Sequence, residues 1–272
     1  MKLRMHASHL QAIRLSVANL AAARHFWESA LGFRCVGETE VNDPILRRIW
    51  GTEGGEMRAA RLERAGSSRI ELFHWEGCTG QPIRDPRRPW DHGVIELQLQ
   101  CAMPDRLIVT LQHHCEMLGE GAFLTPFGER CKLLPDTGES VVLSVPSSEE
   151  CDLFFSGFLG WHLRDRLAIT NGFTGTASIS LCETTIYSSN GGGAGSVEAN
   201  RFVRRADPRI AQSTAERMSP AYTGVWMLTA CVESVIAPEA SVVEVPFVGR
   251  RRAVVTRAPG GVRFGVFERD AR

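Results

Sequence analysis

The sequence predicts an α+β fold of four βαβββ units that are arranged as two pseudo-repeated domains. Residues 10–33 indicate one strand, one helix and the start of another strand, and residues 145–161 repeat this pattern in the second half. Two further strand signals then follow before a second unit of the same kind begins. A repeat at a fixed offset sets the architecture of a chain, so the repeat is the strongest of these three observations.

The first unit begins with the stretch LQAIRLSVANLAAARHFWESALGF, residues 10–33. Apolar residues alternate with small or polar ones from Ile13 to Val17, which is typical of a half-buried strand. Asn19 can then cap a helix whose apolar residues recur at helical spacing, and Gly32 can end that helix in the left-handed conformation. The next strand is expected directly after this glycine.

The second half of the chain repeats this stretch without a gap. Val145 to Trp161 aligns with Val17 to Phe33 at an offset of 128 residues, and the LGF at the end of the first helix returns as LGW. The offset is close to half of the 272 residues. We therefore expect two homologous domains, residues 1–139 and 140–272.

Further strand and helix signals complete the units of the first half. We expect a helix that starts at Pro104, because proline fits the first turn of a helix. Residues 141–145 fall at the end of the second unit and, by the offset, at the start of the third, and the sequence leaves both places open. The expected strands cover residues 57–62, 68–75, 93–100, 132–134 and 141–145.

The second half shows the same order with weaker signals. Ser147 and Glu150 form a capping box for a helix over residues 149–159, and the last unit has only a short, broken helix. We expect a long surface loop at residues 185–219, since the tract from Asn190 to Ser196 is rich in glycine; a lid over a ligand is the functional alternative. The expected strands cover residues 167–170, 176–182, 224–232, 252–257 and 262–267.

Composition and charge limit the class of protein. Apolar residues make up 43% of the chain and charged residues 23%, as in an ordinary globular protein. Lysine plus arginine equals aspartate plus glutamate at 31 each, which argues against a nucleic-acid or anionic-membrane partner. The eight cysteines form no CxxC pair, and no apolar run suits a signal peptide or a membrane span. We therefore expect a cytoplasmic protein with reduced cysteines.

The sequence resembles the vicinal oxygen chelate superfamily, which includes glyoxalases, bleomycin-resistance proteins and extradiol dioxygenases. The resemblance rests on LSVANLAAARHFWESALGF and LSVPSSEECDLFFSGFLGW, and on the closing strands RIELFHW and LLPDTGESVVL. It covers nearly the whole chain and implies paired βαβββ modules whose curved sheets enclose a cavity for a small-molecule ligand. Because two-module relatives form dimers, we expect this four-module chain to be a monomer or a homodimer.

The resemblance also implies where a divalent metal ion would bind, and the sequence departs from that pattern. Metal-binding members use a histidine on the first strand and a glutamate on the last strand of paired modules. Here Ala12 holds the first position and Glu71 the second, while Val94 and Val142 are expected at the two positions of the second module. A single carboxylate does not hold a divalent ion tightly, so we expect no metal and no other cofactor. A register slip of two residues would add His92, which with Glu71 would still be a weak site.

Alternation along the strands gives the residues expected to line the cavity. Glu71 and Glu96 are the candidate catalytic residues, because a carboxyl group in an apolar cavity can act as an acid or a base near neutral pH. Arg14 would hold an anionic or carbonyl group of the ligand. The alternative is that Arg14 pairs with one of the glutamates and that the cluster is structural. The other expected ligand-binding residues are Trp50, Phe73, Trp75, His92 and Gln98.

Three functions stay open at this point. The first is a metal-independent enzyme that performs acid–base chemistry, as an isomerase, lyase or cyclase, on an oxygenated small molecule of secondary metabolism. The second is a protein that binds and sequesters a drug or metabolite in an aromatic groove. The third is a metal-dependent glyoxalase or dioxygenase whose metal ligands lie elsewhere in the sequence. In each case the expected partner is a small molecule, and not a nucleic acid or a membrane.

Overall fold

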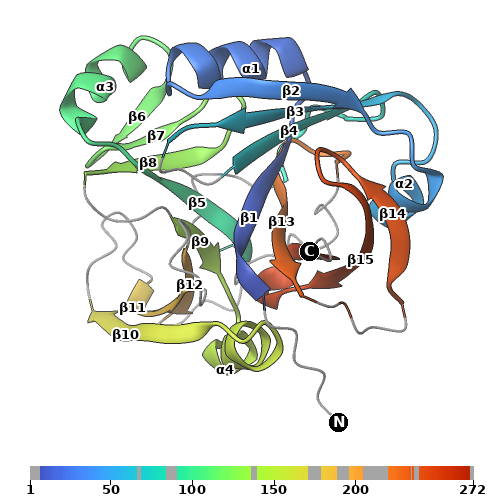
Figure 1. The fold of residues 1–272 in the computed structure, drawn as a ribbon. Helices are drawn as coiled ribbons and strands as arrows, with labels where there is room; N and C mark the ends of the chain where they lie inside the picture. The colour runs from blue at the N-terminus through green and yellow to red at the C-terminus, as the bar shows by residue number, and fades with distance from the viewer. Residues whose placement is uncertain are drawn as a thin grey trace.

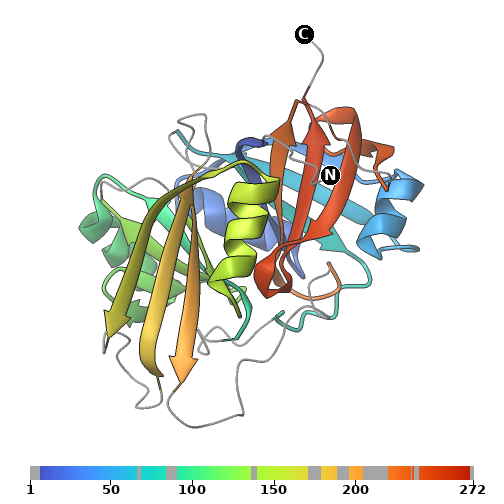
Figure 2. The same ribbon diagram turned by 90° about the horizontal axis from the view of Figure 1, so that it is seen from below.

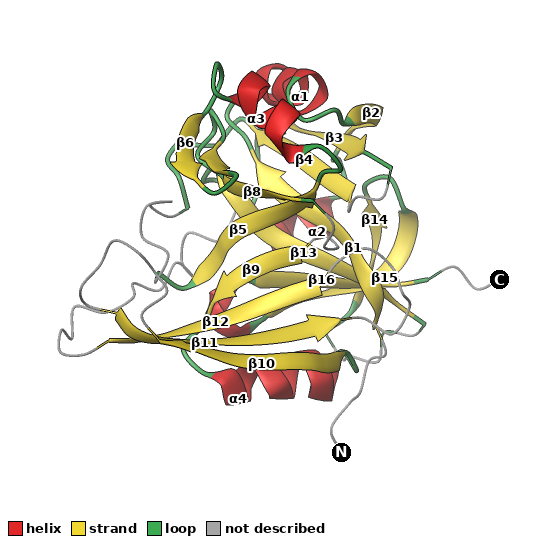
Figure 3. Cartoon of the chain, turned by 90° about the vertical axis from the view of Figure 1, so that its left-hand side faces the viewer, coloured by secondary structure: helices red, strands yellow, loops and turns green. Residues whose placement is uncertain are grey.

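The computed structural model describes residues 7–65, 69–83, 91–135, 140–170, 179–188, 196–204, 220–233, 235 and 239–269. Within these residues, the strands form two eight-stranded mixed sheets, as the predicted α+β fold of repeated modules requires (Figure 1). Helices α1 (Leu20–Ser29) and α3 (Pro104–Leu111) lie at one end of the molecule, and α4 (Ser148–Cys151) lies at the other (Figure 3). No helix in the described part of the chain is long and apolar enough to cross a bilayer.

The first sheet joins the first module to the fourth and has the strand order β14-β15-β16-β13-β1-β4-β3-β2. The two modules meet where β1 and β13 pair in antiparallel fashion. Helix α2 (Pro44–Trp50) follows β2 in the chain and carries Trp50 at its end. The strands are β1 (Ala7–Ser16), β2 (Arg34–Glu40), β3 (Met57–Glu63), β4 (Arg69–Trp75), β13 (Gly224–Val232), β14 (Ser241–Val245), β15 (Gly249–Arg257) and β16 (Arg263–Glu268).

The second sheet joins the second module to the third and has the order β10-β11-β12-β9-β5-β8-β7-β6. The two modules meet where β5 and β9 pair in antiparallel fashion. Each sheet therefore draws modules from both sides of the sequence boundary at residues 139 and 140. The strands are β5 (Gly93–Gln100), β6 (Glu116–Gly119), β7 (Ala122–Leu124), β8 (Arg130–Leu134), β9 (Ser140–Ser144), β10 (His162–Thr170), β11 (Ile179–Ser188) and β12 (Ser196–Arg204).

Strand pairing decides the place of residues 141–145, which the sequence left open. Strand β8 pairs with β5 in parallel, as β4 pairs with β1, and so β8 is the last strand of the second module. Strand β9 pairs with β12 in parallel and is the first strand of the third module. The expectation that residues 141–145 also close the second module is therefore wrong.

The third module differs from its sequence-based prediction in a second way. Residues 185–219 were expected to form a long surface loop, but β11 extends to Ser188 and β12 occupies Ser196–Arg204. The physical reason is visible in SVEANRFVR, where Val197 and Ala199 alternate with polar residues and are buried. The glycine tract at 190–195 lies outside the described residues. In the fourth module, β14 follows β13 with no helix among the described residues between them.

Local sequence explains where the helices begin and end. Asn19 Oδ1 accepts a hydrogen bond from the Ala22 N–H at 2.9 Å, and Ser147 Oγ accepts one from the Glu150 N–H at 3.3 Å. Gly32, with a φ of 70°, follows helix α1 in the left-handed conformation that favours glycine. Helix α4 continues into a π-helix, η1 (Asp152–Phe158). The face of α1 that packs against β3 and β4 buries Leu20, Ala23, Phe26 and Trp27.

Candidate functional site

The helix starts fix which first-strand residues are equivalent in the modules. Ala12, Glu96 and Ser140 each lie seven residues before the N-cap of the first helix in their module. Glu96, and not Val94, is thus the counterpart of Ala12 in the second module. The sequence-based alignment of that module was wrong by two residues, because the weak Met103–Pro104 helix start gave it no clear anchor.

The last strands align through their parallel partners. In each of the first three modules, the last-strand residue is the one that pairs with the residue two positions after the equivalent first-strand residue. These last-strand residues are Glu71, Lys132 and Glu198. Lys132 therefore holds the last-strand position of the second module, where Val142 was expected. In the fourth module, the register of β13 and β16 places Met227 and Gly265 at the two positions.

The first sheet holds a buried cluster of three charges at these positions. Arg14 Nε donates to Glu71 Oε2 at 2.8 Å, and Arg61 Nη2 donates to Glu71 Oε1 at 2.6 Å. Glu71 is 1% exposed and Arg14 is 3% exposed, so neither meets bulk water. Burial lowers the pKa of Arg14, and the charge and hydrogen bond of Glu71 oppose that shift. Arg14 is thus paired with a glutamate, as the predicted alternative required, while the structural role of the cluster stays a prediction.

Aromatic side chains close the space around this cluster. The Arg14 guanidinium lies 5.1 Å from the Trp50 ring centroid and 5.4 Å from that of Phe73. Trp226 contacts both rings edge-on, at 5.3 and 5.8 Å between centroids. At the last-strand position, a Cβ added to Gly265 would lie 3.1 Å from Met227 Sδ. The first sheet thus fills its inner face with side chains at the positions where the sequence resemblance predicted a ligand.

The second sheet holds a polar network at the equivalent positions. Arg130 Nε donates to Glu96 Oε2 at 2.8 Å, and Gln98 Nε2 donates to Glu96 Oε1 at 3.3 Å. The Ser140 hydroxyl contacts Gln98 Oε1 at short range and lies 3.1 Å from Glu198 Oε1. Five side chains from four strands therefore connect two carboxyl groups through hydrogen bonds.

The two carboxyl groups of this network have different surroundings. Glu96 is paired with the Arg130 guanidinium, whereas Glu198 contacts the neutral Ser140 hydroxyl. Burial raises the pKa of Glu198 and the charge of Glu96 raises it further, while hydrogen bonds from Ser140 and Gln98 and the charge of Lys132 lower it.

The structure separates residues that the sequence analysis had placed together. Arg14, Glu71, Trp50 and Phe73 meet in the first sheet, whereas Glu96 and Gln98 lie in the second. The expectation that Arg14, Glu71 and Glu96 share one concave surface is therefore wrong.

Two other predicted ligand-binding residues lie outside both clusters. Trp75 is half-buried, and its Nε1 donates to the Gly54 carbonyl at 3.0 Å. His92 lines a separate cavity beside η1.

Sequence reasoning missed two members of the second cluster, Arg130 and Glu198. Glu198 was hidden because its strand was interpreted as part of a loop. The alternation of SVEANRFVR was the available signal, since it places Glu198 and Asn200 on one face and Val197 and Ala199 on the other. Arg130 comes just before the predicted strand 132–134, so its direction depended on an exact strand start.

A divalent metal ion does not fit either set of family positions. The first sheet offers Glu71 alone, with both carboxylate oxygens taken by arginines. The second offers two carboxyl groups, one of them paired with Arg130, and places the Lys132 ammonium at the last-strand position. No group of three or more histidine, cysteine, aspartate or glutamate side chains with metal-binding geometry occurs among the residues that the structure describes. Cationic side chains stand where metal ligands would be needed.

Comparisons with known proteins agree on the fold. No protein-family model matches the sequence, and no curated protein sequence matches it significantly. Glyoxalase I from Zea mays superposes with a TM-score of 0.65 at 11% identity, over 96% of this chain and 92% of that one. A putative dioxygenase from Bacillus subtilis superposes with a TM-score of 0.56 at 14% identity, over 97% of this chain and 86% of that one.

Proposed function

Since the chain has the four-module fold of the vicinal oxygen chelate superfamily, we propose that it is a small-molecule enzyme with an acid–base site on the second sheet. The site is the network of Arg130, Glu96, Gln98, Ser140 and Glu198. The observation that carries the proposal is the hydrogen-bonded connection of two carboxyl groups, of which Glu96 is paired with Arg130 and Glu198 has a pKa raised by burial. Two carboxyl groups with different proton affinities in one site can serve as base and acid.

The proposed chemistry is proton transfer on an oxygenated substrate, as in an isomerase or a lyase, without a metal ion. Glu96, held by Arg130 and Gln98, removes a proton from a carbon next to a carbonyl group. Glu198 donates a proton to the substrate on the other side of the network. The cations of Arg130 and Lys132 stabilise the negative charge that develops on the substrate oxygen, which is the role that a metal ion would otherwise have.

Catalysed hydrogen exchange tests this proposal even while the substrate is unidentified. The protein is incubated in D₂O with a panel of α-hydroxy ketones, 2-oxo acids and β-keto acids, and loss of the α-proton signal is followed by NMR. We expect exchange for at least one class, and a loss of about 10²-fold or more in Glu96→Gln and Glu198→Gln. Glu149→Gln, an exposed change outside the network, is the matched control and should keep the rate.

The same variants separate the proposal from its alternatives. In a sequestering protein, bound compounds would show no exchange, and both glutamine variants would keep most of their affinity. In a metal-dependent enzyme, exchange would require an added ion and would stop with a chelator. The proposal also retains the predicted small-molecule partner. The cytoplasmic location and the monomeric or homodimeric state remain predictions.

A further inference from the structure

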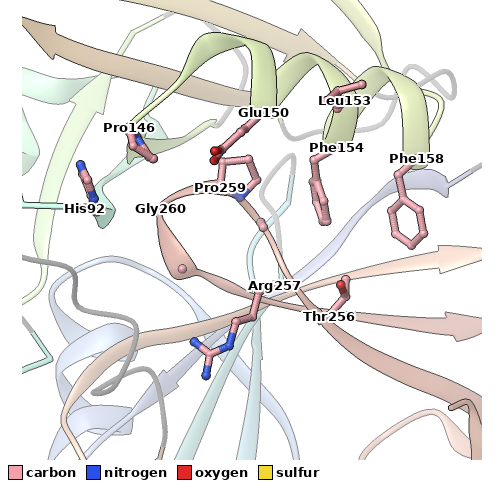
Figure 4. Close-up of a pocket in the computed structure, with 12 residues that line it drawn as sticks. His92, Pro146, Glu150, Leu153, Phe154, Phe158, Thr256, Arg257, Pro259 and Gly260 are labelled. Carbon is pink, nitrogen blue, oxygen red and sulfur yellow. The ribbon is translucent and has the colours of Figure 1, made fainter.

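A cavity lies at the opposite end of β9 from the acid–base network. It has a volume of about 530 Å³ and is located where the α4–η1 helix meets the turn after β15 (Figure 4). Figure 2 shows this helix next to the red strands of the fourth module. Pro146, just beyond the end of β9, lines the cavity, whereas Ser140 of the network begins that strand. The volume is within the range of about 300–1,000 Å³ that is usual for small-molecule sites.

One side of the cavity is aromatic. Phe154 and Phe158, one turn apart on η1, have ring centroids 5.5 Å from each other, and Leu153 beside them is 58% exposed. Two hydrogen bonds fix this helix to the strands of the third module, because Asp152 accepts from Tyr187 of β11 and from Arg166 of β10, each at 2.7 Å. π-Helical turns are rare and frequently occur at functional sites. The anchored π-helix holds two phenyl rings against the open space.

The opposite side of the cavity is formed by a tightly seated turn. Gly260 has a φ of 76°, and a Cβ at this position would lie 2.6 Å from the Ser144 carbonyl oxygen and 3.2 Å from the Gly93 nitrogen. The turn from Ala258 to Gly261 therefore sits directly on the start of β5 and the end of β9. Because the turn packs so tightly against these strands, we expect this side of the cavity to keep its shape when no ligand is bound.

The polar side chains of the cavity point to the charge of its ligand. Figure 4 shows the Arg257 guanidinium and the His92 imidazole to one side of the two phenyl rings. Arg257, at the end of β15, is the one arginine among the described residues that line the cavity. Burial lowers the pKa of Arg263, and repulsion from the charge of Arg257 lowers it further. Glu150 is the one acidic side chain among the described residues that line the cavity.

We propose that this cavity binds a planar aromatic acid, with its ring against Phe154 and Phe158 and its anionic group toward Arg257. A guanidinium can hold a carboxylate through two parallel hydrogen bonds, and phenyl rings pack edge-on or offset against an aromatic ligand. This second site does not depend on the acid–base network. Its position between the third and fourth modules distinguishes it from the inner faces of both sheets.

Three naphthalene probes with one ring system test the ligand class. Calorimetric titration compares 2-naphthoate, neutral 2-naphthamide and cationic 2-naphthylmethylamine on the full chain. We expect 2-naphthoate to bind about tenfold or more tightly than the cation, with the amide between them. Equal affinity of the three probes, or tighter binding of the cation, would overturn the proposal.

Variants of the lining residues test whether the probe binds in this cavity and whether a positive charge there favours binding. Arg257→Gln should weaken 2-naphthoate binding roughly tenfold, and Glu150→Gln should strengthen it, because the ligand loses an attracting charge in one case and a repelling charge in the other. Arg252→Gln and Glu149→Gln make the same chemical changes at exposed positions outside the cavity and should leave affinity unchanged.

Loss of the aromatic wall gives an independent measurement. Phe158→Ala should abolish measurable binding of all three probes, and Phe158→Leu, which keeps an apolar side chain, should weaken it by a smaller factor. Thermal unfolding of each variant confirms that it is folded before titration. If folded Phe158→Leu and Arg257→Gln bind 2-naphthoate as the parent chain does, the ligand does not occupy this cavity.

Discussion

The two sheets use the same strand register and fill it in opposite ways. In the first sheet, the equivalent positions are Ala12, Glu71, Met227 and Gly265, and aromatic rings close over them. In the second, they are Glu96, Lys132, Ser140 and Glu198, and the side chains form a half-buried polar network. The fold thus determines which positions can form a site. The residue types at these positions determine whether they form a packed core or a polar site.

Glutamate illustrates this difference because both sheets place it beside arginine. Glu71 is 1% exposed, and its two oxygens accept hydrogen bonds from Arg14 and Arg61. Glu96 is 9% exposed, has one arginine partner, and connects through Gln98 to a second carboxyl group. Both oxygens of Glu71 are thus occupied by guanidinium groups, whereas Glu96 is connected through Gln98 and Ser140 to a second carboxyl group.

The largest expected effect is on the first sheet. Glu71→Gln removes the negative charge that compensates two buried guanidinium groups, and we expect it to lower the free energy of unfolding by about 3–5 kcal/mol. Urea denaturation followed by tryptophan fluorescence measures this change. Glu63→Gln is the matched control, because its pair with Arg69 is about 40% exposed on both sides and should contribute less than about 1 kcal/mol.

The opposite result would also be informative. A Glu71→Gln protein of parental stability that has lost catalysed exchange would show that Glu71 acts on a substrate. The proposed division of roles between the two sheets would then be reversed.

A smaller effect is expected from a methyl group at the closed end of the first sheet. In Gly265→Ala, the new Cβ would approach Met227 Sδ to 3.1 Å and Thr229 Cγ2 to 3.3 Å. We expect a loss of about 1–3 kcal/mol in unfolding free energy, the usual cost of overpacking a core. Thermal or urea unfolding measures the loss.

A double-mutant cycle identifies the contact responsible. Met227→Ala alone should cost about 2–5 kcal/mol through the space it leaves. Combined with Gly265→Ala, the total cost should fall clearly below the sum of the two, because the new methyl group occupies part of that space. Simple additivity would show that Met227 is not what closes the site.

Sequence patterns predicted the architecture because the first and third modules begin with strong, equivalent signals. The alternation before Asn19 and before Ser147, followed by LGF and LGW, fixes two of the modules at a known offset. The way in which the modules join could not be predicted, since pairing of β1 with β13 spans more than 200 residues. No local feature of either strand specifies its partner. The alternation of apolar and polar residues is compatible both with pairing of modules within each half of the chain and with pairing across the two halves.

The site was only partly predictable for a related reason. Glu96 and Gln98 were identified because GVIELQLQ alternates clearly, but their partners depended on strands with weak signals. Glu198 lies on a strand preceded by glycines, and Arg130 lies at a strand start. A one-residue error in either place turns a side chain to the other face, so the network required the pairing itself.

The pH dependence of stability tests the charge state of Glu198. Its pKa is raised in the folded protein, so the folded state holds this proton more tightly than the unfolded chain. Its stabilising contribution is full below the unfolded glutamate pKa of about 4.3 and is lost as pH rises through the folded pKa. Glu198→Gln mimics the protonated form. Its midpoint temperature should therefore exceed that of the parent chain above this window and match it at lower pH.

Exposed Glu149→Gln is the control for this measurement and should follow the parent chain at each pH. A Glu198→Gln protein that is less stable than the parent near pH 7 would mean that Glu198 is ionised and paired there. Glu198 could then not serve as the proposed acid.

The smallest expected effect is the response of the protein to metal ions. A thermal-shift scan with Fe(II), Mn(II), Ni(II) and Zn(II) should leave the midpoint temperature unchanged, because Lys132 and Arg130 place positive charge where the second sheet would need ligands. Bound metal at 100 times its Kd would stabilise the protein by about 2.7 kcal/mol, a shift that such a scan detects easily. Lys132→Glu sharpens the test, since it replaces the excluding cation by a third carboxylate beside Glu96 and Glu198. We expect this variant to gain a shift with at least one ion. A shift in the parent chain would instead show that the polar network is a metal site and that its cations move aside.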